Sequence, residues 1–321
     1  MEPIKDAPPR PRGSQHIVLC LDSLEVSRCA AGFARRLATP DTKLTILSLA
    51  LDPHEYASNT ARSEPDRGME HRELMERAER AITEASTVLA KSVAAVRSRV
   101  IDLAKEGDSV VHELAAEAGE DRAGLLILGI RQHHGLVRWF DPAVMDRLSR
   151  FATCALIVVP AVYESTYDAG VQRVLFAVDG SVTSLVAVGV GARFAAADTQ
   201  IRVVYVVDRA ICPGGLMPAT PLELALVKEG TLAIAAAAKE LECLHNVTPS
   251  LVSTALISTE TGTDDIASAT LREAQRCDAD LIVMGTHGRR GGARAYLGSV
   301  PNRVASLVEI PLMLVRERHN V

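Results

Sequence analysis

The chain contains the same order of segments twice, at a nearly constant offset. Asp22 precedes Asp179 by 157 residues, and Gly129 precedes Gly285 by 156 residues. A period of this length is far too long for a solenoid repeat and indicates a duplicated domain. Of all the features of the sequence, this repeat restricts the choice of fold most strongly, because both copies must be able to form the same architecture.

Each copy alternates short apolar runs with segments of helical pattern. We predict strands at residues 17–21, 44–51, 96–103, 125–128 and 155–159, and again at 174–178, 201–207, 251–257, 281–284 and 312–315. Predicted helices include 25–38, 70–95, 144–151, 184–197, 222–245 and 264–276. Continuous apolar runs are typical of strands buried on both faces of a parallel sheet. The alternation predicts two doubly wound α/β domains at residues 15–160 and 172–321, with a disordered leader at 1–14 and a linker at 161–171.

Composition supports this class and excludes several others. Hydrophobic residues make up 48% of the 321 positions and aromatic residues 3%, so the cores must be filled by aliphatic side chains. A net charge of −5 provides no basic field for nucleic acid or an anionic membrane. No secretory leader or membrane-length apolar run is visible, and the six cysteines show no CxxC spacing. We therefore expect a cytoplasmic protein with mostly buried thiols.

The stretch after the strand at 281–284 carries the strongest functional pattern. Gly285, Gly288 and the pair Gly298-Ser299 follow the strand, and a helical pattern begins there. Glycines let a backbone approach a ligand closely, and Ser299 is a suitable helix cap. Free amides at a helix N-terminus form a phosphate site. The loop also contains three arginines, which are Arg289, Arg290 and Arg294.

Each part of this pattern also has a simpler interpretation. The loop could be a tight surface turn without a ligand, and its arginines could be solvated. Asp179, at the end of the matching strand, could cap the following helix. His287 could act as a general base, but positioning or plain exposure is the better interpretation.

Several other motifs do not support chemistry. Gly189-Val190-Gly191 begins a dinucleotide fingerprint, but it lies inside a predicted helix and Phe194 fills the third glycine position. Close helix packing is the better interpretation. A G-x4-G-K-[S/T] phosphate loop is absent, and no metal set or Ser/His/Asp set can be nominated from spacing. We therefore predict no catalytic residue.

The residues that carry these patterns resemble the universal stress protein family. The resemblance rests on G-x2-G-x9-G-S at 285–299, VLFAVDGS at 174–181 and DADLIVMGTHG at 278–288, and it extends over almost the whole chain as two tandem copies. It implies two tandem Rossmann-like domains, each a five-stranded parallel sheet of order 3-2-1-4-5 flanked by helices. It also implies ATP at the carboxyl ends of strands one and four, with the participation of Mg²⁺ left open.

The resemblance also implies which residues form the ATP site. Asp179 would bind the adenosine part, the backbone near Val206 or Val207 would face adenine, and the loop glycines would border the ribose and phosphates. The full implied set is Asp179, Gly180, Ser181, Val206, Val207, Gly285, His287, Gly288, Arg289, Arg290, Gly298, Ser299 and Val300.

The N-terminal copy departs from the family pattern in the same loop. Gln132 occupies the second glycine position, and Pro142-Ala143 replaces the glycine–serine pair. Proline has no amide to donate to a phosphate, and alanine has no hydroxyl. We therefore predict that the N-terminal domain does not bind ATP in the family mode.

The leading functional hypothesis is an ATP-binding stress-response or regulatory protein with its nucleotide in the C-terminal domain. One alternative is slow ATP hydrolysis or self-phosphorylation with Ser299 or a nearby hydroxyl as acceptor. Another is an interaction module that binds an unknown protein without nucleotide. The apolar strands at 155–159 and 312–315 should lie at sheet edges, so we expect them to pair as a pseudo-dimer within one chain. Homodimerisation of whole chains is left open.

Overall fold

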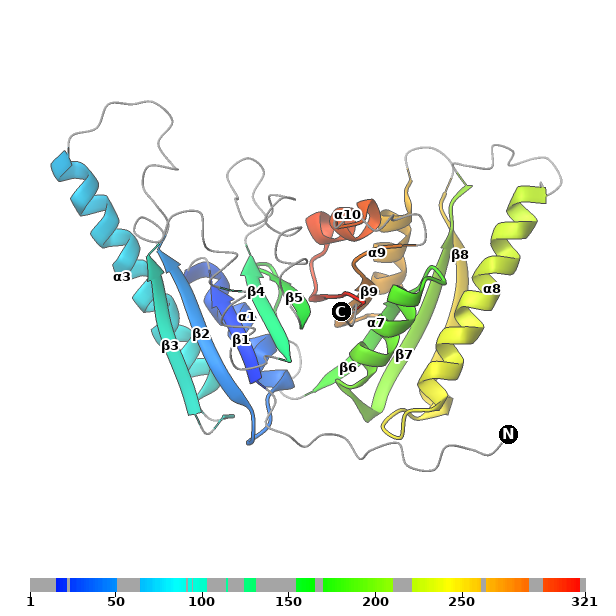
Figure 1. The fold of residues 1–321 in the computed structure, drawn as a ribbon, viewed down its shortest axis with the longest axis horizontal. Helices are drawn as coiled ribbons and strands as arrows, with labels where there is room; N and C mark the ends of the chain where they lie inside the picture. Colours follow the sequence, from blue (N-terminus) through cyan, green and yellow to red (C-terminus); the bar gives the residue numbers. More distant parts are fainter. Residues whose placement is uncertain are drawn as a thin grey trace.

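The structure is a computed structural model in which one sheet runs through the whole molecule (Figure 1). It describes residues 16–21, 24–50, 64–90, 92–93, 95–102, 114, 124–130, 154–164, 170–209, 221–260, 264–288 and 297–317. No helix within these ranges is both long and apolar enough to cross a membrane.

The two halves of the chain use the same order of strands and helices. The N-terminal half contains β1 (His16–Leu21), α1 (Leu24–Leu37), β2 (Lys43–Ala50), α3 (Glu64–Leu89), β3 (Ala95–Asp102), β4 (Leu125–Ile130) and β5 (Ala155–Pro160). The C-terminal half contains β6 (Val171–Ala177), α7 (Val182–Ala192), β7 (Ala195–Val207), α8 (Pro221–Glu242), the 3₁₀ turn η4 (Pro249–Leu251), β8 (Val252–Ser258), α9 (Ile266–Arg276), β9 (Leu281–Gly285), α10 (Ser299–Leu307) and β10 (Leu312–Val315).

The strand order confirms the predicted sheet topology. The ten strands lie in the order β3-β2-β1-β4-β5-β10-β9-β6-β7-β8, so each half has the order 3-2-1-4-5. All pairings within a half are parallel. The last strands of the two halves, β5 and β10, pair antiparallel, with Met313 opposite Ile157. This pairing inside one chain is the one that their apolar sequences predict.

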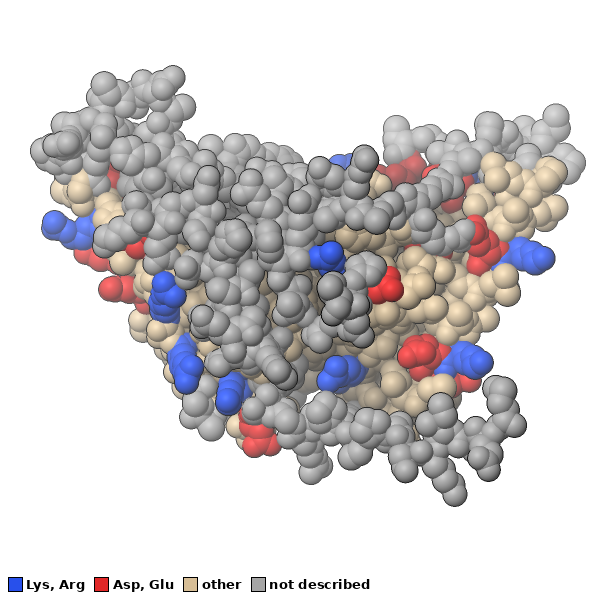
Figure 2. All heavy atoms as spheres, viewed as in Figure 1, with Lys and Arg blue, Asp and Glu red and all other residues tan. Residues whose placement is uncertain are grey.

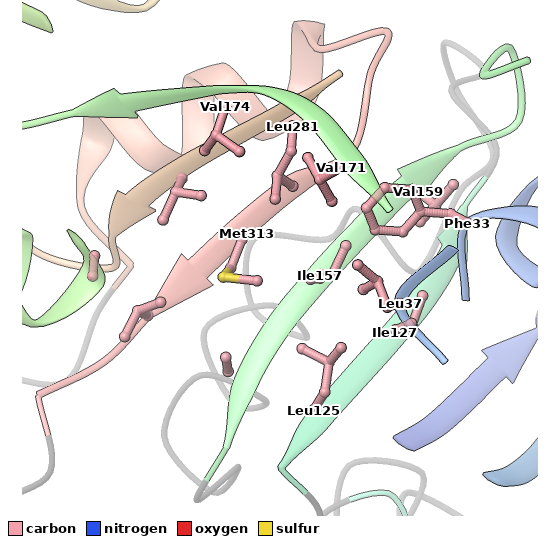
Figure 3. Close-up of a cluster of buried hydrophobic side chains, with 14 of the residues drawn as sticks. Phe33, Leu37, Leu125, Ile127, Ile157, Val159, Val171, Val174, Leu281 and Met313 are labelled. Atoms are coloured by element: carbon pink, nitrogen blue, oxygen red, sulfur yellow. The ribbon is translucent and has the colours of Figure 1, made fainter. Parts of the chain in front are cut away.

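A hydrophobic core lies on each face of the sheet. One core packs α1, α3, α7 and α8 against residues such as Ile157, Leu281 and Met313, and it continues across the junction of the halves (Figure 3). The other core includes Val304 of α10 and Ala267 of α9. The inner strands β1, β4, β5, β9 and β10 are buried at every position, which explains why their sequences are continuously apolar.

A buried ion pair joins the two halves at the same junction. The Arg36 guanidinium, at the end of α1, lies with its Nη2 atom 2.5 Å from Oδ2 of Asp280, which precedes β9. Arg36 Nε donates to the carbonyl of Gly170 at 2.8 Å, and Nη1 donates to the Tyr163 hydroxyl. The side chain of Arg36 is 0% exposed and that of Asp280 is 8% exposed. Residues from α1, the segment between the halves and β9 thus meet around one cation.

Two predicted helix boundaries are wrong. The helix predicted to continue to Ala197 ends at Ala192, and β7 already begins at Ala195. The Thr199 hydroxyl stabilises this early start, because it accepts the amide of Ala196 and donates to the carbonyl of Val171 on β6. The helix predicted at 70–95 is α3, which begins at Glu64 and ends at Leu89.

The prediction that most thiols are buried is only partly correct. Of the five cysteines in the described ranges, Cys20 is buried, Cys29, Cys154 and Cys277 are half-buried, and Cys243 is exposed. None of these five forms a disulfide. Burial is the main cause that raises the pKa of the Cys29 and Cys277 thiols. Both side chains are therefore neutral and weakly reactive at neutral pH.

Candidate functional site

A cavity of about 870 Å³ lies at the carboxyl ends of β6, β7 and β9 in the C-terminal half. Its walls also include α8 and the N-terminal turns of α9 and α10. The volume falls within the roughly 300–1,000 Å³ that is usual for small-molecule sites. The position is the one where open parallel sheets bind ligands, outside the carboxyl edge where the strand order reverses.

Most of the residues implied by the resemblance line this cavity. They are Asp179, Val206, Gly285, His287, Gly288, Gly298, Ser299 and Val300. Gly180, Ser181 and Val207 do not line it. Arg289, Arg290 and Arg294 lie outside the described residues, as do the loop positions 132 and 142–143 of the N-terminal half. The fold therefore collects residues 177–179, 204–206, 208, 284–285, 287–288, 298–301 and 303 around one space.

Asp179 is held in place by the turn that follows it. Its Oδ1 atom accepts hydrogen bonds from the amide of Ser181 at 3.0 Å and from the Ser181 hydroxyl at 2.6 Å. Gly180 adopts a φ of 79°, a left-handed conformation that glycine takes at little cost. The Ser181 hydroxyl accepts the amide of Ser184 and so caps α7. The cap is therefore Ser181, and Asp179 stabilises the turn around it.

Gly288 brings the glycine loop directly against Asp179. A Cβ atom at position 288 would lie 2.6 Å from Oδ2 of Asp179, closer than real Cβ contacts allow. Any other residue at this position would have to displace the carboxylate. The absence of a side chain at Gly288 thus keeps an acidic group and the backbone of the loop in contact.

Gly285 is required first by packing. A Cβ atom there would lie 3.0 Å from Cγ2 of Thr183 and 3.2 Å from the amide nitrogen of Ser184, both at the start of α7. At the equivalent position of the N-terminal half, a Cβ on Gly129 would lie 2.9 Å from Cβ of Ala30 on α1. Both glycines let the first helix of their half pack against the end of the fourth strand, and this role does not depend on a ligand.

The N-terminus of α10 presents fewer amides to the cavity than the sequence predicts. The amide of Gly298 donates to the carbonyl of Thr286 at 2.8 Å, so it is already used within the protein. Ser299 does not cap the helix; it is the first helical residue, and Gly298 is the N-cap without a side-chain bond. Among the described residues, nothing accepts a hydrogen bond from the amides of Ser299 and Val300, as expected in a first turn. These two amides are the donors available to an anion.

The charged side chains in the described walls of the cavity are mainly acidic. Asp179, Asp208, Glu229 and Asp265 line it, with Arg303 as the guanidinium among the described lining residues. The Arg303 Nε atom lies 3.5 Å from Oδ2 of Asp265. A bound polyphosphate would therefore need positive charge in addition to Arg303.

Asp265 itself is accounted for by the helix that it precedes. Its Oδ1 atom accepts the amide of Ser268 at 2.7 Å, so it is the N-cap of α9. This backbone hydrogen bond is the main cause that lowers the pKa of the Asp265 carboxyl. A carboxylate at a helix N-terminus is also favoured by the helix dipole. The charge of Asp265 is thus part of the fold and need not contact a ligand.

His287 lines the cavity beside a neighbouring hydroxyl. Its Nδ1 atom lies 2.9 Å from the hydroxyl oxygen of its neighbour Thr286. In the described part of the chain, no group of three or more His, Cys, Asp or Glu side chains is arranged to hold a metal ion.

Tyr205 and Glu229 line the cavity and were not predicted from the sequence. The sequence signal for the close approach of α8 to the sheet is Gly230, a glycine inside an alanine-rich helix. A Cβ at Gly230 would lie 2.5 Å from Cδ1 of both Tyr205 and Leu256, so this glycine lets α8 lie directly on β7 and β8. Sequence periodicity does not reveal which side of α8 would meet those strands.

Several known structures are similar to this chain. A universal stress protein from Archaeoglobus fulgidus DSM 4304 has a TM-score of 0.55 and 15% identity, over 95% of this chain and 97% of that chain. A protein of unknown function from Pseudomonas aeruginosa PAO1 has a TM-score of 0.50 and 15% identity, over 94% and 92%. A universal stress protein solved in complex with cAMP is 22% identical over 48% of this chain and 100% of that chain, with a TM-score of 0.35. The first two likenesses concern the fold alone, and the third supports no conclusion about this chain.

No curated protein sequence is a significant match to the chain. The sequence pattern of the Universal stress protein family, in contrast, matches twice, at residues 13–160 and 170–316. The two matches fall on the two halves whose strands have the order 3-2-1-4-5. Together they span nearly the whole chain, and the protein is therefore a tandem member of the Universal stress protein family.

Proposed function

We propose that the cavity of the C-terminal half binds ATP and that the protein acts as a nucleotide-dependent regulator in stress response. Membership of the family supports the stress-response role. The observation that carries the nucleotide proposal is that Ser299 and Val300, whose amides are in the first turn of α10, line the cavity at a helix N-terminus. Such amides, aided by the helix dipole, favour phosphate oxygens.

The two ends of the cavity suit the two ends of a nucleotide. Ala177, Val204 and Val206 contribute apolar side chains to the wall, as a purine base requires, and Asp179 lies next to Gly288 of the glycine loop. The first turn of α10 also contributes to the wall. The adenosine would then contact the ends of β6 and β7, while the phosphates would lie at the start of α10.

Charge balance is a further condition of this proposal. Four carboxylates and one guanidinium in the described walls do not favour a polyphosphate by themselves. Arg289, Arg290 and Arg294 belong to the same loop in the sequence and are candidates for this positive charge. A divalent cation bound with the phosphates would serve the same purpose. We therefore expect ATP binding to strengthen when Mg²⁺ is present.

A proline at position 299 tests the role of the amides directly. Ser299 is the first residue of α10, where proline is tolerated, and Gly298 has φ −59° and ψ 153°, which a following proline allows. Ser299→Pro should therefore keep the fold while it removes one of the two amides. A hydrogen bond to a charged group contributes about 1.5–3 kcal/mol. The affinity for ATP should fall about tenfold or more, since about 1.4 kcal/mol corresponds to a factor of ten.

The matched control is Ser299→Ala, which keeps the amide and removes only the hydroxyl. Isothermal titration calorimetry of the full chain with ATP, with and without Mg²⁺, should give one site per chain for the wild type and for Ser299→Ala. Equal affinity of the proline and alanine variants would exclude the amide as a ligand. No heat and no binding at millimolar ATP in any variant would refute nucleotide binding altogether and favour a nucleotide-independent interaction module.

A further inference from the structure

The ten-stranded sheet ends in two edge strands of very different character. β3 lies at one end and β8 at the other, and each pairs with a described strand on one side only. Figure 1 places them, with their covering helices α3 and α8, at opposite ends of the molecule. An edge strand exposes backbone N–H and C=O groups, and proteins usually protect such an edge with charge, bulges or a cover.

β3 is protected by charge. Its sequence is AVRSRVID, and Arg97, Ser98 and Arg99 are exposed. If β3 paired antiparallel with a second copy of itself about Ser98, Arg97 would face the partner's Arg99. Like charges directly opposite each other in a sheet are destabilising. The helix above it, α3, also carries exposed charged side chains on its outer face, which are Arg72, Glu73, Glu76, Arg77, Glu79 and Arg80.

β8 has no such protection. Its sequence, VSTALIS, has no charged residue, and Ser253, Thr254 and Leu256 are exposed. Leu256 is 38% exposed although it is a large apolar side chain. If β8 paired antiparallel with a second copy about Ala255, Thr254 would face the partner's Leu256 without electrostatic repulsion. The strand is thus compatible with its own copy where β3 is not.

The helix that covers β8 extends this apolar surface. Leu224 and Leu232 of α8 are 59% and 63% exposed, and Leu222 is 48% exposed. Gly230 allows α8 to lie directly on β8, since a Cβ there would overlap Leu256. In Figure 2 the end of the molecule that α8 occupies shows uncharged surface with charged side chains of both signs scattered over it. The edge strand and its covering helix therefore expose apolar side chains at the same end of the sheet.

The chain already contains one interface of this type. β5 and β10 are uncharged edge strands of their own halves, and they pair antiparallel with Leu312 opposite Val158 and Leu314 opposite Leu156. We propose that β8 does the same between chains: two copies associate about a twofold axis through β8, and the surface of α8 with its exposed leucines flanks this contact. A twofold contact of this kind uses the same patch on both copies and closes at a dimer.

The strands β5 and β10 cannot supply a homodimer, since they are paired with each other inside the chain. Association between chains therefore has to use a surface other than β5 and β10. It does not depend on nucleotide binding, because neither β8 nor the exposed leucines of α8 belong to the lining of the cavity.

Sedimentation equilibrium of the full chain over a wide concentration range tests the proposal. The wild type should behave as a dimer that dissociates on dilution. Thr254→Lys places two lysines close to the twofold axis, in the same way that Arg97 and Arg99 would meet in a pair of β3 strands. It should raise the dissociation constant of the dimer by at least tenfold. Ser98→Lys makes the same change at the other edge and should leave it unchanged. Circular dichroism establishes that both variants are folded.

Two results would overturn the assignment. The first is a wild type that stays monomeric at every concentration up to its solubility limit. The second is a dimer that Thr254→Lys does not weaken, which would place the contact elsewhere. Leu232→Glu, on the outer face of α8, provides a variant that leaves the strand untouched. It should also weaken the dimer, and no effect would remove α8 from the contact.

Discussion

The buried ion pair between Arg36 and Asp280 makes the two halves dependent on each other for stability. In Arg36→Met, the methionine keeps an apolar stem of similar length but leaves the Asp280 carboxylate without its cation. That carboxylate would keep the amide of Gln172 at 3.0 Å and the amide of Arg173 at 3.1 Å. These bonds offset only part of the loss, because the carboxylate is 8% exposed and cannot regain hydration.

Removal of one partner from a buried pair costs about 3–5 kcal/mol, because an uncompensated charge remains buried. The total stability of a folded domain is only about 5–15 kcal/mol. Arg36→Met should therefore lower the free energy of unfolding by about 3–5 kcal/mol. The double variant Arg36→Met/Asp280→Asn leaves no buried charge, so it should be more stable than the sum of the two single losses implies.

Urea unfolding followed by circular dichroism measures these differences. The matched control is Arg28→Gln, which breaks the ion pair between Arg28 and Glu84. The side chain of Arg28 is 77% exposed. Exposed pairs contribute about 0–1 kcal/mol, so this control should stay close to the wild type. The argument fails if Arg36→Met loses no more than Arg28→Gln, or if the losses of the two single variants simply add in the double variant.

Two further predictions concern packing and charge. Gly191→Ala should destabilise the protein by about 1–3 kcal/mol in urea unfolding, because its Cβ would lie 2.7 Å from Cε1 of Phe176. Gly189→Ala, in the same helix with only a 3.4 Å contact, should be neutral or stabilising, and the reverse order would contradict the packing. The Arg272 side chain lowers the pKa of Asp264 from 3.8 to about 2, so its contribution to stability is complete above pH 4 and lost as the pH falls towards 2. NMR titration of Arg272→Gln should show a raised pKa for Asp264, and an unchanged pKa would exclude this cause.

The strands and their order follow from short-range patterns in the sequence. Runs such as 17–21 and 281–284 are apolar at every position, and this pattern is typical of a sheet covered on both faces. The boundary at 192–195 could not be predicted in the same way. Ala195, Ala196 and Ala197 favour a helix locally, but pairing with β6 at Val171 places Ala195 in a strand. Tertiary contacts override a weak local preference there.

The candidate site could be predicted only in part, because it also depends on contacts between segments that are distant in the sequence. The glycine loop and Asp179 are recognisable in the sequence, but the contact between Gly288 and Asp179 joins residues that are 109 positions apart. The use of the Gly298 amide by Thr286 is equally invisible, because the spacing of glycines does not tell which N–H groups bind inside the protein. Glu229 enters the cavity only because Gly230 lets α8 approach the sheet.

By itself, the sequence determined the duplicated architecture and the loop in which an anion site was to be sought. Periodicity and glycine placement act over a few residues, so they can be read from the linear order. Only the tertiary structure decided that Gly285 serves the packing of α7, that Ser299 and Val300 line the cavity, and that β5 and β10 pair with each other. These outcomes depend on which distant surfaces meet, and that is set by the burial of the whole sheet rather than by any one segment.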